Sequence, residues 1–337
     1  MPTIKDVAER AHVSIATVSR VLNKTRYVSP DVVRRVQQAI HDLDYQHNAL
    51  ARNLRRSQSL TIGVIIPDSN NPFFAEMTRG IEDTCFEEGY VVVLCNSNED
   101  VNKAASYLTT LYQHRTAGLI VVAPGDMTEP LEDYIQRGYP IVLVDRPLPN
   151  LSADMVVSDN YGGARLAIQH LVSLGHRRIG LITGDHHLET VKSRWCGVEE
   201  AMKEAGLPLL PELTYNRGDF LAESGREGAA YFFRLEQPPT AIFALNDLMA
   251  LGVLSYAYDH HIHIPTQLSV VGFDNIEMTS YAVPGLTTVA QPKYELGQQA
   301  ATLLLKRIQG DSAVLQKTTL PTRLILRHST GRPRAEP

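Results

Sequence analysis

The sequence predicts an α/β protein in which a small all-α helix-turn-helix head precedes a two-lobed body of doubly wound parallel sheets. Three observations predict this class. Short amphipathic helical patterns fill residues 1–46, and from Thr61 onward apolar runs typical of buried strands alternate with longer helical patterns. The charge also divides the chain, because residues 1–60 hold ten Lys and Arg against five Asp and Glu.

That division places a net charge of +5 on residues 1–60 and leaves -10 on residues 61–337, out of a total of -5. A basic module joined to an acidic body is typical of a nucleic-acid-binding head on a ligand-binding domain. The three cysteines, Cys85, Cys95 and Cys196, are too few and too scattered for a disulfide framework or a zinc site, and we interpret them as buried thiols. No run approaches the ~18 apolar residues of a membrane span, so we expect a cytoplasmic protein without a membrane partner.

The head is predicted to form three short helices around one miniature core. Thr3 and Asp6 form a capping-box-like start for the first helix. Ser14 is a natural N-cap for a second helix over Ile15–Leu22, and Ser29-Pro30-Asp31 start a third. Two short helices joined this closely form a helix-turn-helix.

A helix-turn-helix reads DNA by placing the start of its second helix in the major groove. Ile15, Ala16 and Arg20 then face base edges, where Arg20 can donate two hydrogen bonds to guanine. Thr17, Asn23 and Arg26 suit contacts with phosphates. The alternative from the helix pattern alone is that these residues merely solvate a small helical domain.

The amino-acid sequence of the head distinguishes these alternatives. Thr3-Ile4-Lys5-Asp6-Val7-Ala8 and Thr17-Val18-Ser19-Arg20-Val21-Leu22-Asn23 closely resemble the lactose/galactose/purine repressor family, called the LacI family. Within the predicted linker, residues 47–60, Asn48-Ala49-Leu50-Ala51-Arg52-Asn53-Leu54 resembles that family's hinge helix. The resemblance implies that Leu54 wedges into the minor groove of DNA, and we expect Arg55 to contact DNA beside it. It also implies a homodimer on a pseudo-palindromic operator in double-stranded DNA.

In the body, unusual polar and aromatic residues follow the predicted strands. The clearest strands are Ile62–Ile66, Val91–Leu94, Leu119–Val122, Ile141–Val144, Ile179–Ile182, Ala241–Leu245 and Ser269–Phe273. In open parallel sheets, ligands bind beyond the carboxyl ends of the strands. The residues that we expect to bind a small effector there are Asn71, Phe73, Phe74, Asp145, Arg146, Arg194, Phe220, Asn246, Asp274 and Gln291.

These residue types fit a monosaccharide. The two aspartates accept from pairs of hydroxyls, the arginines donate in forks, the amides do both, and the three phenylalanines cover the C–H faces of a sugar ring. Each residue also has a structural explanation, since Phe73 could belong to a core and Asp145 could cap a helix. The coincidence of seven such motifs at strand ends favours binding.

The body also resembles the periplasmic ribose-binding proteins, and its polar residues match the ribose-binding set motif by motif. That resemblance implies a body over residues 61–327, made of two sublobes, residues 61–158 with 292–320 and residues 159–291 with 321–327, which close on the effector. We expect the sugar to act as an inducer that relieves repression, with ribose as the leading choice and Trp195 narrowing the pocket.

Two other effectors remain open. Purine-responsive repressors carry an arginine and a threonine before the position of Arg194, where this chain has Leu188-Glu189-Thr190, a departure that argues against a purine corepressor. Gly80-Ile81-Glu82-Asp83 is similar to regulators that bind a phosphorylated carrier protein, but that helix is common in the family.

An enzyme is not expected. The sequence contains neither a phosphate-binding loop of the P-loop type nor a Gly-x-Gly-x-x-Gly fingerprint, so we expect no cofactor. His260-His261 and His263 lack further ligands, and we interpret them as an exposed loop and not as a metal site. Residues 328–337 are predicted to be a polar tail that cannot form a coiled coil.

Overall fold

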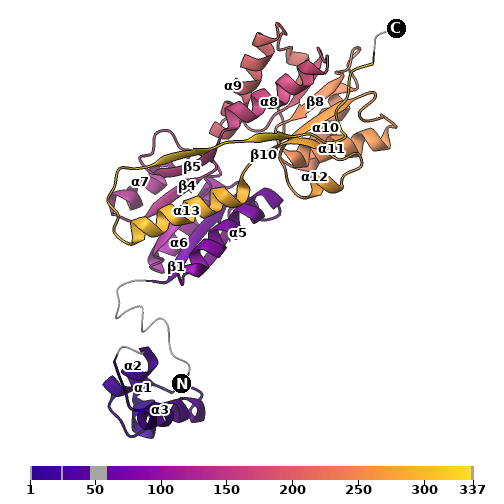
Figure 1. Ribbon diagram of the computed structural model, residues 1–337. Helices are drawn as coiled ribbons and strands as arrows, with labels where there is room; N and C mark the ends of the chain where they lie inside the picture. Colours follow the sequence, from indigo (N-terminus) through magenta and orange to yellow (C-terminus); the bar gives the residue numbers. More distant parts are fainter. Residues whose placement is uncertain (1, 24–25, 46–58, 335–337) are drawn as a thin grey trace. The chain divides into compact units, whose positions relative to one another are not determined.

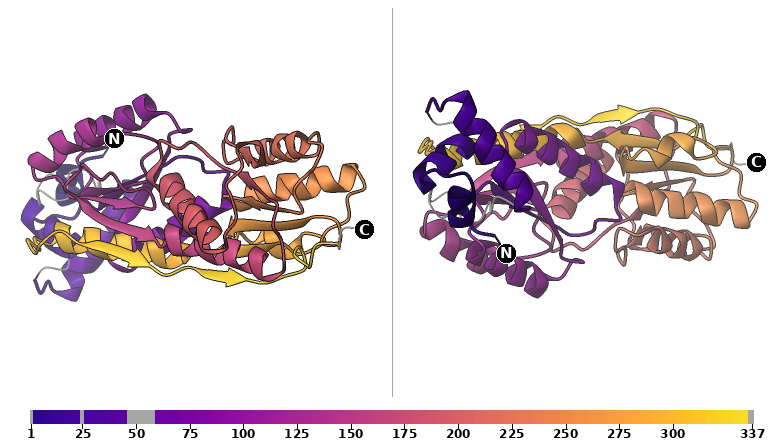
Figure 2. Two further views of the ribbon diagram at one scale, coloured as in Figure 1. Left: turned by 90° about the horizontal axis from the view of Figure 1, so that it is seen from above. Right: turned by 90° about the horizontal axis from the view of Figure 1, so that it is seen from below.

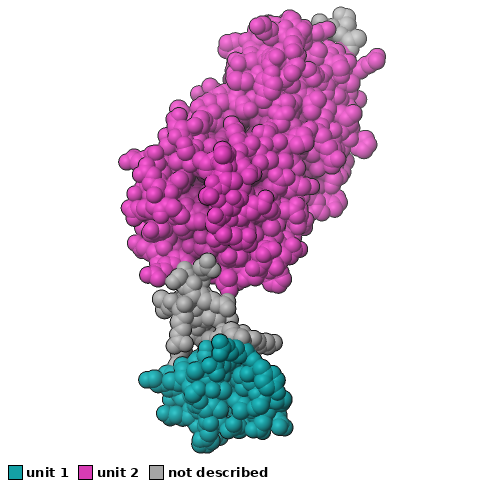
Figure 3. Space-filling model, turned by 60° about the vertical axis from the view of Figure 1, so that its left-hand side comes forward, with its two compact units in different colours: residues 1–58 teal, residues 59–337 magenta. Residues whose placement is uncertain are grey.

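The structure is a computed structural model that describes residues 2–23, 26–45 and 59–334. The chain divides into two compact units, residues 1–58 and residues 59–337, which are coloured separately in Figure 3. We describe each unit by itself, as the head and the body.

The head is formed by α1 (Ile4–Arg10), α2 (Ile15–Asn23) and α3 (Pro30–Asp42) (Figure 1). The predicted starts are present, because Thr3 and Asp6 form a reciprocal capping box and Pro30 occupies the first turn of α3. The Ser14 hydroxyl accepts from the Thr17 amide at 3.1 Å and so caps α2. The core is made of the buried residues Val7, Ala8, Ala11, Val18, Val36 and Ala39.

The first lobe of the body is built on a six-stranded sheet whose neighbouring strands all pair in parallel, in the order β11-β5-β4-β3-β1-β2. Its strands are β1 (Thr61–Ile66), β2 (Val91–Asn96), β3 (Gly118–Val121), β4 (Ile141–Val144), β5 (Asp154–Ser158) and β11 (Lys317–Leu320). Its helices are α5 (Pro72–Glu87), α6 (Val101–Gln113), α7 (Thr128–Gln136) and α13 (Lys293–Ile308).

The second lobe follows the first in the body (Figure 2) and repeats its plan. Its strand order is β12-β10-β9-β8-β6-β7, in which only β12 is antiparallel to its neighbour. Its strands are β6 (Ile179–Ile182), β7 (Thr214–Tyr215), β8 (Ala241–Ala244), β9 (Ser269–Asp274), β10 (Thr287–Ala290) and β12 (Arg323–Ile325). Its helices are α8 (Asn160–Ser173), α9 (Glu189–Glu204), the 3₁₀ turn η1 (Pro211–Leu213), α10 (Ala222–Phe232), α11 (Asp247–Asp259) and α12 (Met278–Tyr281).

Both sheets are covered on two faces, which is why their central strands are apolar throughout. Every residue of β3, β4, β6 and β8 is buried. In the first lobe, α5 and α13 pack unusually closely on one another. A side chain at Gly80 would lie 2.2 Å from the carbonyl oxygen of Tyr294, and one at Gly297 would lie 2.0 Å from that of Met77. The two glycines therefore allow the backbones of these helices to pack in direct contact.

The chain crosses between the lobes three times: from β5 to α8, from β10 to α13, and from β11 to β12 (Figure 1). Two crossovers are joined to one another, because the Asp159 amide donates to the Leu320 carbonyl at 2.8 Å and the Thr322 hydroxyl donates to the Asp159 carbonyl at 3.1 Å. The lobes are thus connected by short, mutually bonded segments, as a hinge requires.

The end of the chain corrects one prediction. The sequence predicts a polar tail from His328 onward, but Ser329 is buried between β9 and β10. Its hydroxyl donates to the Val270 carbonyl at 2.6 Å and accepts from the Thr287 amide at 2.8 Å. The packed body therefore extends past Arg327. Across the described residues, no helix combines the length and the apolarity needed to cross a membrane.

Candidate functional site

One candidate surface lies on α2 in the head. The side chains of Ile15, Ala16 and Arg20 are exposed, whereas Val18 on the opposite side of the helix is buried in the core. The three residues that were predicted to read bases are therefore exposed to solvent on one face of the helix. That face is free to enter a DNA groove.

The other residues predicted to contact DNA differ in how exposed their side chains are. Thr17 is half-buried, and its hydroxyl lies 2.8 Å from that of Ser14. Arg26 is exposed, as a phosphate contact must be. Asn23 ends α2, but its side chain is outside the description, and Leu54 and Arg55 lie outside the described residues.

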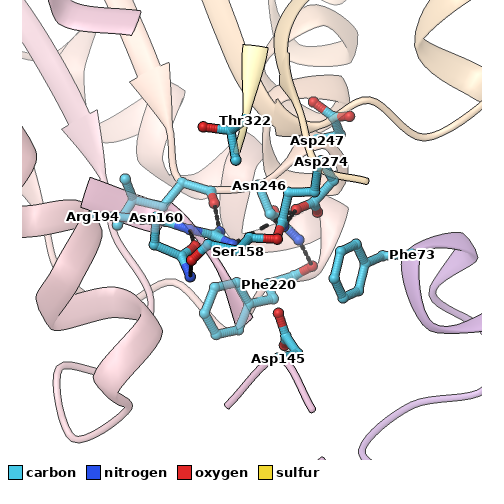
Figure 4. Close-up of polar contacts among 12 residues, drawn as sticks. Phe73, Asp145, Ser158, Asn160, Arg194, Phe220, Asn246, Asp247, Asp274 and Thr322 are labelled. Carbon is cyan, nitrogen blue, oxygen red and sulfur yellow. Dashed lines mark hydrogen bonds and ion pairs between the residues drawn. The ribbon is translucent and has the colours of Figure 1, made fainter. Parts of the chain in front are cut away.

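A second candidate site is a cavity of about 410 Å³ between the two lobes of the body. That volume falls in the range of roughly 300 to 1,000 Å³ of small-molecule sites. All ten residues predicted to bind an effector line it, and Figure 4 shows several of them converging from both lobes. The lining residues that the sequence analysis did not select are Pro67, Asp68, Asn70, Asn98, Glu99, Thr190, Asp219 and Leu221.

Parallel strand geometry brings these distant residues together. Asp145 directly follows β4, Asn246 caps α11 after β8, Asp274 ends β9 and Gln291 directly follows β10. The carboxyl ends of parallel strands lie at the same edge of a sheet, and these edges of the two sheets face one another across the cavity.

Asp145 is buried and only partly satisfied. Its backbone has a left-handed φ of 66°, and its amide donates to the Val156 carbonyl at 2.9 Å. Within the described part of the chain, its Oδ1 has no hydrogen-bond partner. Burial raises the pKa of Asp145, and the positive charges of Arg146 and Arg194 oppose that rise. The cavity therefore contains a buried acceptor that a ligand can satisfy by donating a hydrogen bond.

Arg194 is a buried cation that is held from several sides. Its Nε donates to Asn160 Oδ1 at 2.7 Å, its Nη1 donates to the Leu245 carbonyl, and its Nη2 lies 3.8 Å from Asp274 Oδ1. Its guanidinium also lies 3.8 Å from the centre of the Phe273 ring. Burial lowers the pKa of Arg194, although nearby aspartates counter this shift. Asn160 was missed because nothing in the sequence links it to a residue that is 34 positions away.

Asp274 forms the centre of the second lobe's wall. Its Oδ1 accepts from Gln291 Nε2 at 2.7 Å, while Gln291 Oε1 is buried and has no partner among the described residues. Burial raises the pKa of Asp274 to about 6, against the opposing charge of Arg194. Behind it, burial and the charge of Asp274 also raise the pKa of Asp247.

The aromatic residues enter the cavity from both lobes (Figure 4). Phe73 and Phe74 lie in the first turn of α5 and meet edge to face, with their ring centres 5.1 Å apart. Phe220 has a left-handed φ of 67°, and the Asn246 side chain donates to its carbonyl at 2.9 Å. The Phe220 ring lies against Gly184, where any side chain would lie 2.4 Å from it. Apolar rings thus border a polar cavity on opposite sides.

Arg146 forms an ion pair with Glu99, a residue outside the predicted binding set. Its Nη1 and Nη2 donate to the two carboxylate oxygens of Glu99 at 2.6 and 2.8 Å. Glu99 lies in the loop after β2, and its position after a strand was the same signal that identified the other residues. It went unselected because the polar run from Asn96 to Asp100 resembles an ordinary surface turn.

The structure also places Trp195, the three cysteines and the side chains that could bind a metal ion. Trp195 does not line the cavity as predicted, since its ring packs against His186 and its Nε1 donates to Glu199 at 2.8 Å. Cys85 is buried, but Cys95 is half-buried and Cys196 is exposed, so the prediction of three buried thiols was wrong. The described residues contain no cluster of three or more side chains that could hold a metal ion.

A helix-turn-helix head carried by a two-lobed body with an interlobe cavity defines a DNA-binding regulator with an effector-binding domain. Two family models match the chain. Residues 3–48 match the bacterial regulatory proteins of the lacI family, and residues 168–330 match the periplasmic binding protein-like domain.

Curated relatives agree with this class. The chain is 38% identical over 311 residues to the HTH-type transcriptional repressor PurR of Aliivibrio salmonicida, covering 92% of this chain and 93% of the relative. It is also 38% identical over 331 residues to PurR of Actinobacillus pleuropneumoniae, covering 98% of both chains. The chain therefore belongs to the LacI family and is a DNA-binding transcriptional repressor, not an enzyme.

Solved structures give the same result. The lac repressor dimer bound to operator and the anti-inducer ONPF has a TM-score of 0.88 and 28% identity, and the match covers 98% of this chain and 99% of that one. A LacI family transcriptional regulator from Enterococcus faecium with bound ribose has a TM-score of 0.75 and 34% identity, covering 81% of this chain and 99% of that one. These matches confirm the predicted fold class of a helix-turn-helix head and two parallel-sheet lobes.

Proposed function

We propose that this repressor is controlled by an uncharged monosaccharide, a pentose such as ribose, bound in the interlobe cavity. The observation that carries the proposal is the pair of buried acceptors with no partner among the described residues, Asp145 Oδ1 and Gln291 Oε1. A buried acceptor without a hydrogen bond carries a free-energy cost that a donor from a ligand removes, and sugar hydroxyls are donors. The apolar faces of Phe73 and Phe220 suit the C–H surfaces of the ring.

The charges of the cavity favour a neutral ligand over a sugar phosphate. Acidic residues outnumber basic ones in the lining, where Asp68, Glu99, Asp145, Asp219 and Asp274 accompany Arg146 and Arg194. Arg146 already binds Glu99 through both terminal nitrogens, and Arg194 already donates to Asn160 and Leu245. A phosphate would therefore meet buried carboxylates without a free cation to pair with.

The regulatory mechanism follows from the cavity's position. The effector contacts both lobes, so it stabilises the closed arrangement by its differential affinity for that state. Closure then changes the spacing of two heads in a homodimer and with it their fit to a pseudo-palindromic operator. In this proposal the sugar is an inducer, Ile15, Ala16 and Arg20 read base edges, and Leu54 and Arg55 contact the minor groove.

Two solved relatives support a sugar effector. The Enterococcus faecium regulator mentioned above was crystallised with ribose. A putative ribose operon repressor from Burkholderia thailandensis has a TM-score of 0.71 and 30% identity.

A purine corepressor is the second candidate, and the curated relatives favour it. Those relatives carry the name PurR and span nearly the whole chain. Thr190 lines the cavity, in agreement with the threonine expected of purine-responsive members. Leu188, however, occupies the position of their arginine and is buried in the core of the second lobe. Sequence similarity thus supports a purine, whereas the chemistry of the cavity supports a sugar.

Calorimetry on the full chain distinguishes the two candidates. We expect D-ribose to bind and ribose 5-phosphate, adenine, guanine and hypoxanthine not to bind. The same ligands are then added to protein bound to an operator selected from random duplex DNA. Release of DNA by ribose supports an inducer, whereas tighter DNA binding with a purine establishes the corepressor. Binding of the phosphate ester would contradict the charge argument.

A further inference from the structure

The turn Asp274–Ile276 joins the effector cavity to the interior of the opposite lobe. Asp274 and Asn275 have left-handed φ values of 119° and 55°. Two consecutive residues other than glycine adopt this conformation only when their surroundings hold them there. The turn is therefore a fixed element whose position is set by its contacts.

On its own side, the turn is held by three side chains of the second lobe. Asp247 Oδ2 accepts from the Ile276 amide at 2.9 Å, and Thr288 Oγ1 accepts from the Asn275 amide at 3.3 Å. Arg327 Nη2 donates to Asn275 Oδ1 at 2.7 Å. These bonds tie the turn to α11, to β10 and to the segment after β12, all in the second lobe, so it moves with that lobe.

On the other side, the turn is bound by the first lobe. Lys293, the first residue of α13, is only 4% exposed, and its Nζ donates to the carbonyls of Asp274 at 3.0 Å and Asn275 at 2.9 Å. Glu76 in α5 lies 3.4 Å from the same Nζ. Ile276 is buried in the apolar cluster formed by α5, α13 and the first sheet.

We propose that Lys293 is a positioning residue that couples effector binding at Asp274 to the movement of the α5–α13 pair, a proposal that rests on the proposed function. The ammonium group donates to the two carbonyls of the turn and forms an ion pair with Glu76. A buried ammonium cannot lose these partners without an uncompensated desolvation cost. When an effector moves Asp274, Lys293 follows the carbonyls and draws α13 with it.

The close packing of the two helices carries this displacement onward. At Gly80 and Gly297 the backbones of α5 and α13 are in direct contact, so a shift of α13 presses on α5. Because Phe73 and Phe74 also lie in the first turn of α5, the effector acts on one end of this helix directly and on its partner helix through Lys293. None of the described residues of α13 lines the cavity, so a response in α13 reports coupling and not contact.

Hydrogen exchange measured with and without saturating D-ribose tests the proposal. In the full-length wild-type protein, we expect ribose to slow exchange in peptides of α13 by at least about fivefold, the lower end of ordinary coupling. In Lys293→Met, ribose still binds at Asp274 and protects residues 270–277, but the slowing in α13 is lost. An undiminished response of α13 in a saturated K293M protein would overturn the proposal.

A second variant covers the case in which K293M does not fold. Glu76→Gln removes only the carboxylate partner of the ammonium and leaves the two carbonyl bonds in place. We expect E76Q to bind ribose within about twofold of wild type, well inside the range of a lost surface ion pair, and to weaken the response of α13. Lys306→Met, at the exposed end of the same helix, is the matched control and should respond like wild type.

A ligand-free comparison separates this proposal from the choice of effector. Asp274→Asn alters the charge of the turn without any ligand. If wild type binds neither sugars nor purines, the proposed effector fails, but D274N should still change exchange in α13 when Lys293 is present and not when it is replaced by Met. Equal effects of D274N in both backgrounds would contradict the coupling role.

Discussion

In the head, the side chains that we expect to contact DNA lie in solvent, whereas in the body the charged side chains that we expect to contact the effector are buried. In the head, Ile15 is 37% exposed and Arg20 is also exposed on the same helix. In the body, Asp145 is 5% exposed and Asp274 is 4% exposed. The head therefore pays little to display its recognition residues, whereas the body holds charges away from water.

This difference indicates two kinds of recognition. Surface cations act on DNA through charge that salt screens, and each contact contributes modestly. Buried carboxylates lose hydration in the free protein, so a ligand that satisfies them gains more from each hydrogen bond. The same burial makes the empty body less stable than it would be with neutral side chains, which gives the comparison its testable consequences.

The largest expected effect is on effector binding. Asp145→Ala removes a charged acceptor that can bind two hydroxyls at about 1.5 to 3 kcal/mol each, so we expect effector affinity to fall on the order of a hundredfold or more. Asp145→Asn keeps one acceptor and should lose less. Calorimetry with D-ribose measures both variants, and a loss below about threefold in D145A would show that Asp145 does not contact the ligand.

The next effect is on stability and depends on pH. Burial raises the pKa of Asp274 to about 6 from 3.8, so the folded state binds this proton more tightly than the unfolded state does. The stabilisation is fully present below about pH 4 and is lost as the pH rises through 6, at a total of up to about 3 kcal/mol. Asp274→Asn removes this loss.

Denaturant unfolding of wild type and D274N between pH 4 and pH 8 checks this prediction. Carboxyl groups away from Asp274 titrate alike in both proteins, so the difference between the two curves reports Asp274 together with Asp247, whose pKa the charge of Asp274 raises. We expect D274N to gain stability over wild type as the pH rises and to lose effector binding. A difference that stays constant with pH would mean that Asp274 keeps an ordinary pKa.

A substitution on the exposed face of α2 should change operator binding and leave effector binding as it is. Arg20→Ala removes a side chain that can bind guanine through two hydrogen bonds, at roughly 1 to 3 kcal/mol, so operator affinity should fall about five- to a hundredfold. Effector affinity should not change. Fluorescence anisotropy with the selected operator and with single base-pair substitutions measures the loss, which would be uniform across sequences if Arg20 contacted only phosphate.

The smallest expected effect is on the stability of the head. Ser14→Ala removes the side-chain cap of α2 and should cost about 1 kcal/mol. Ser14→Asp keeps an acceptor at the cap and should recover most of the loss. Hydrogen exchange in peptides of the head, measured as the temperature rises, detects the loss of stability. The body should unfold as in wild type.

The cavity could be predicted to a large extent because its residues follow strands. Asp145, Asn246, Asp274 and Gln291 each stand immediately after an apolar run that forms a parallel strand. Parallel pairing then aligns those positions at one edge regardless of their separation in the sequence. Glu99 satisfies the same rule, but its role as the partner of Arg146 depends on a contact across 47 residues.

Residues on helices were harder to predict. Trp195 follows Arg194 in α9, and successive residues of an α-helix point about 100° apart, so one faces the cavity and the other does not. The exposure of Cys196 has the same cause. Lys293 gave no signal either, because a lysine at the start of a helix is ordinary until its distant partners are known.

The sequence by itself determined the three helices of the head, seven of the strands of the body and the residues that stand at the ends of those strands. These features depend on local hydrophobic periodicity and on capping residues, both of which act over a few positions. Only the tertiary structure decided which acceptors remain unsatisfied in the cavity, how Ser329 is buried and how Lys293 joins the two lobes. Those features depend on contacts between segments far apart in the chain, and their energies are set by burial, which no local pattern specifies.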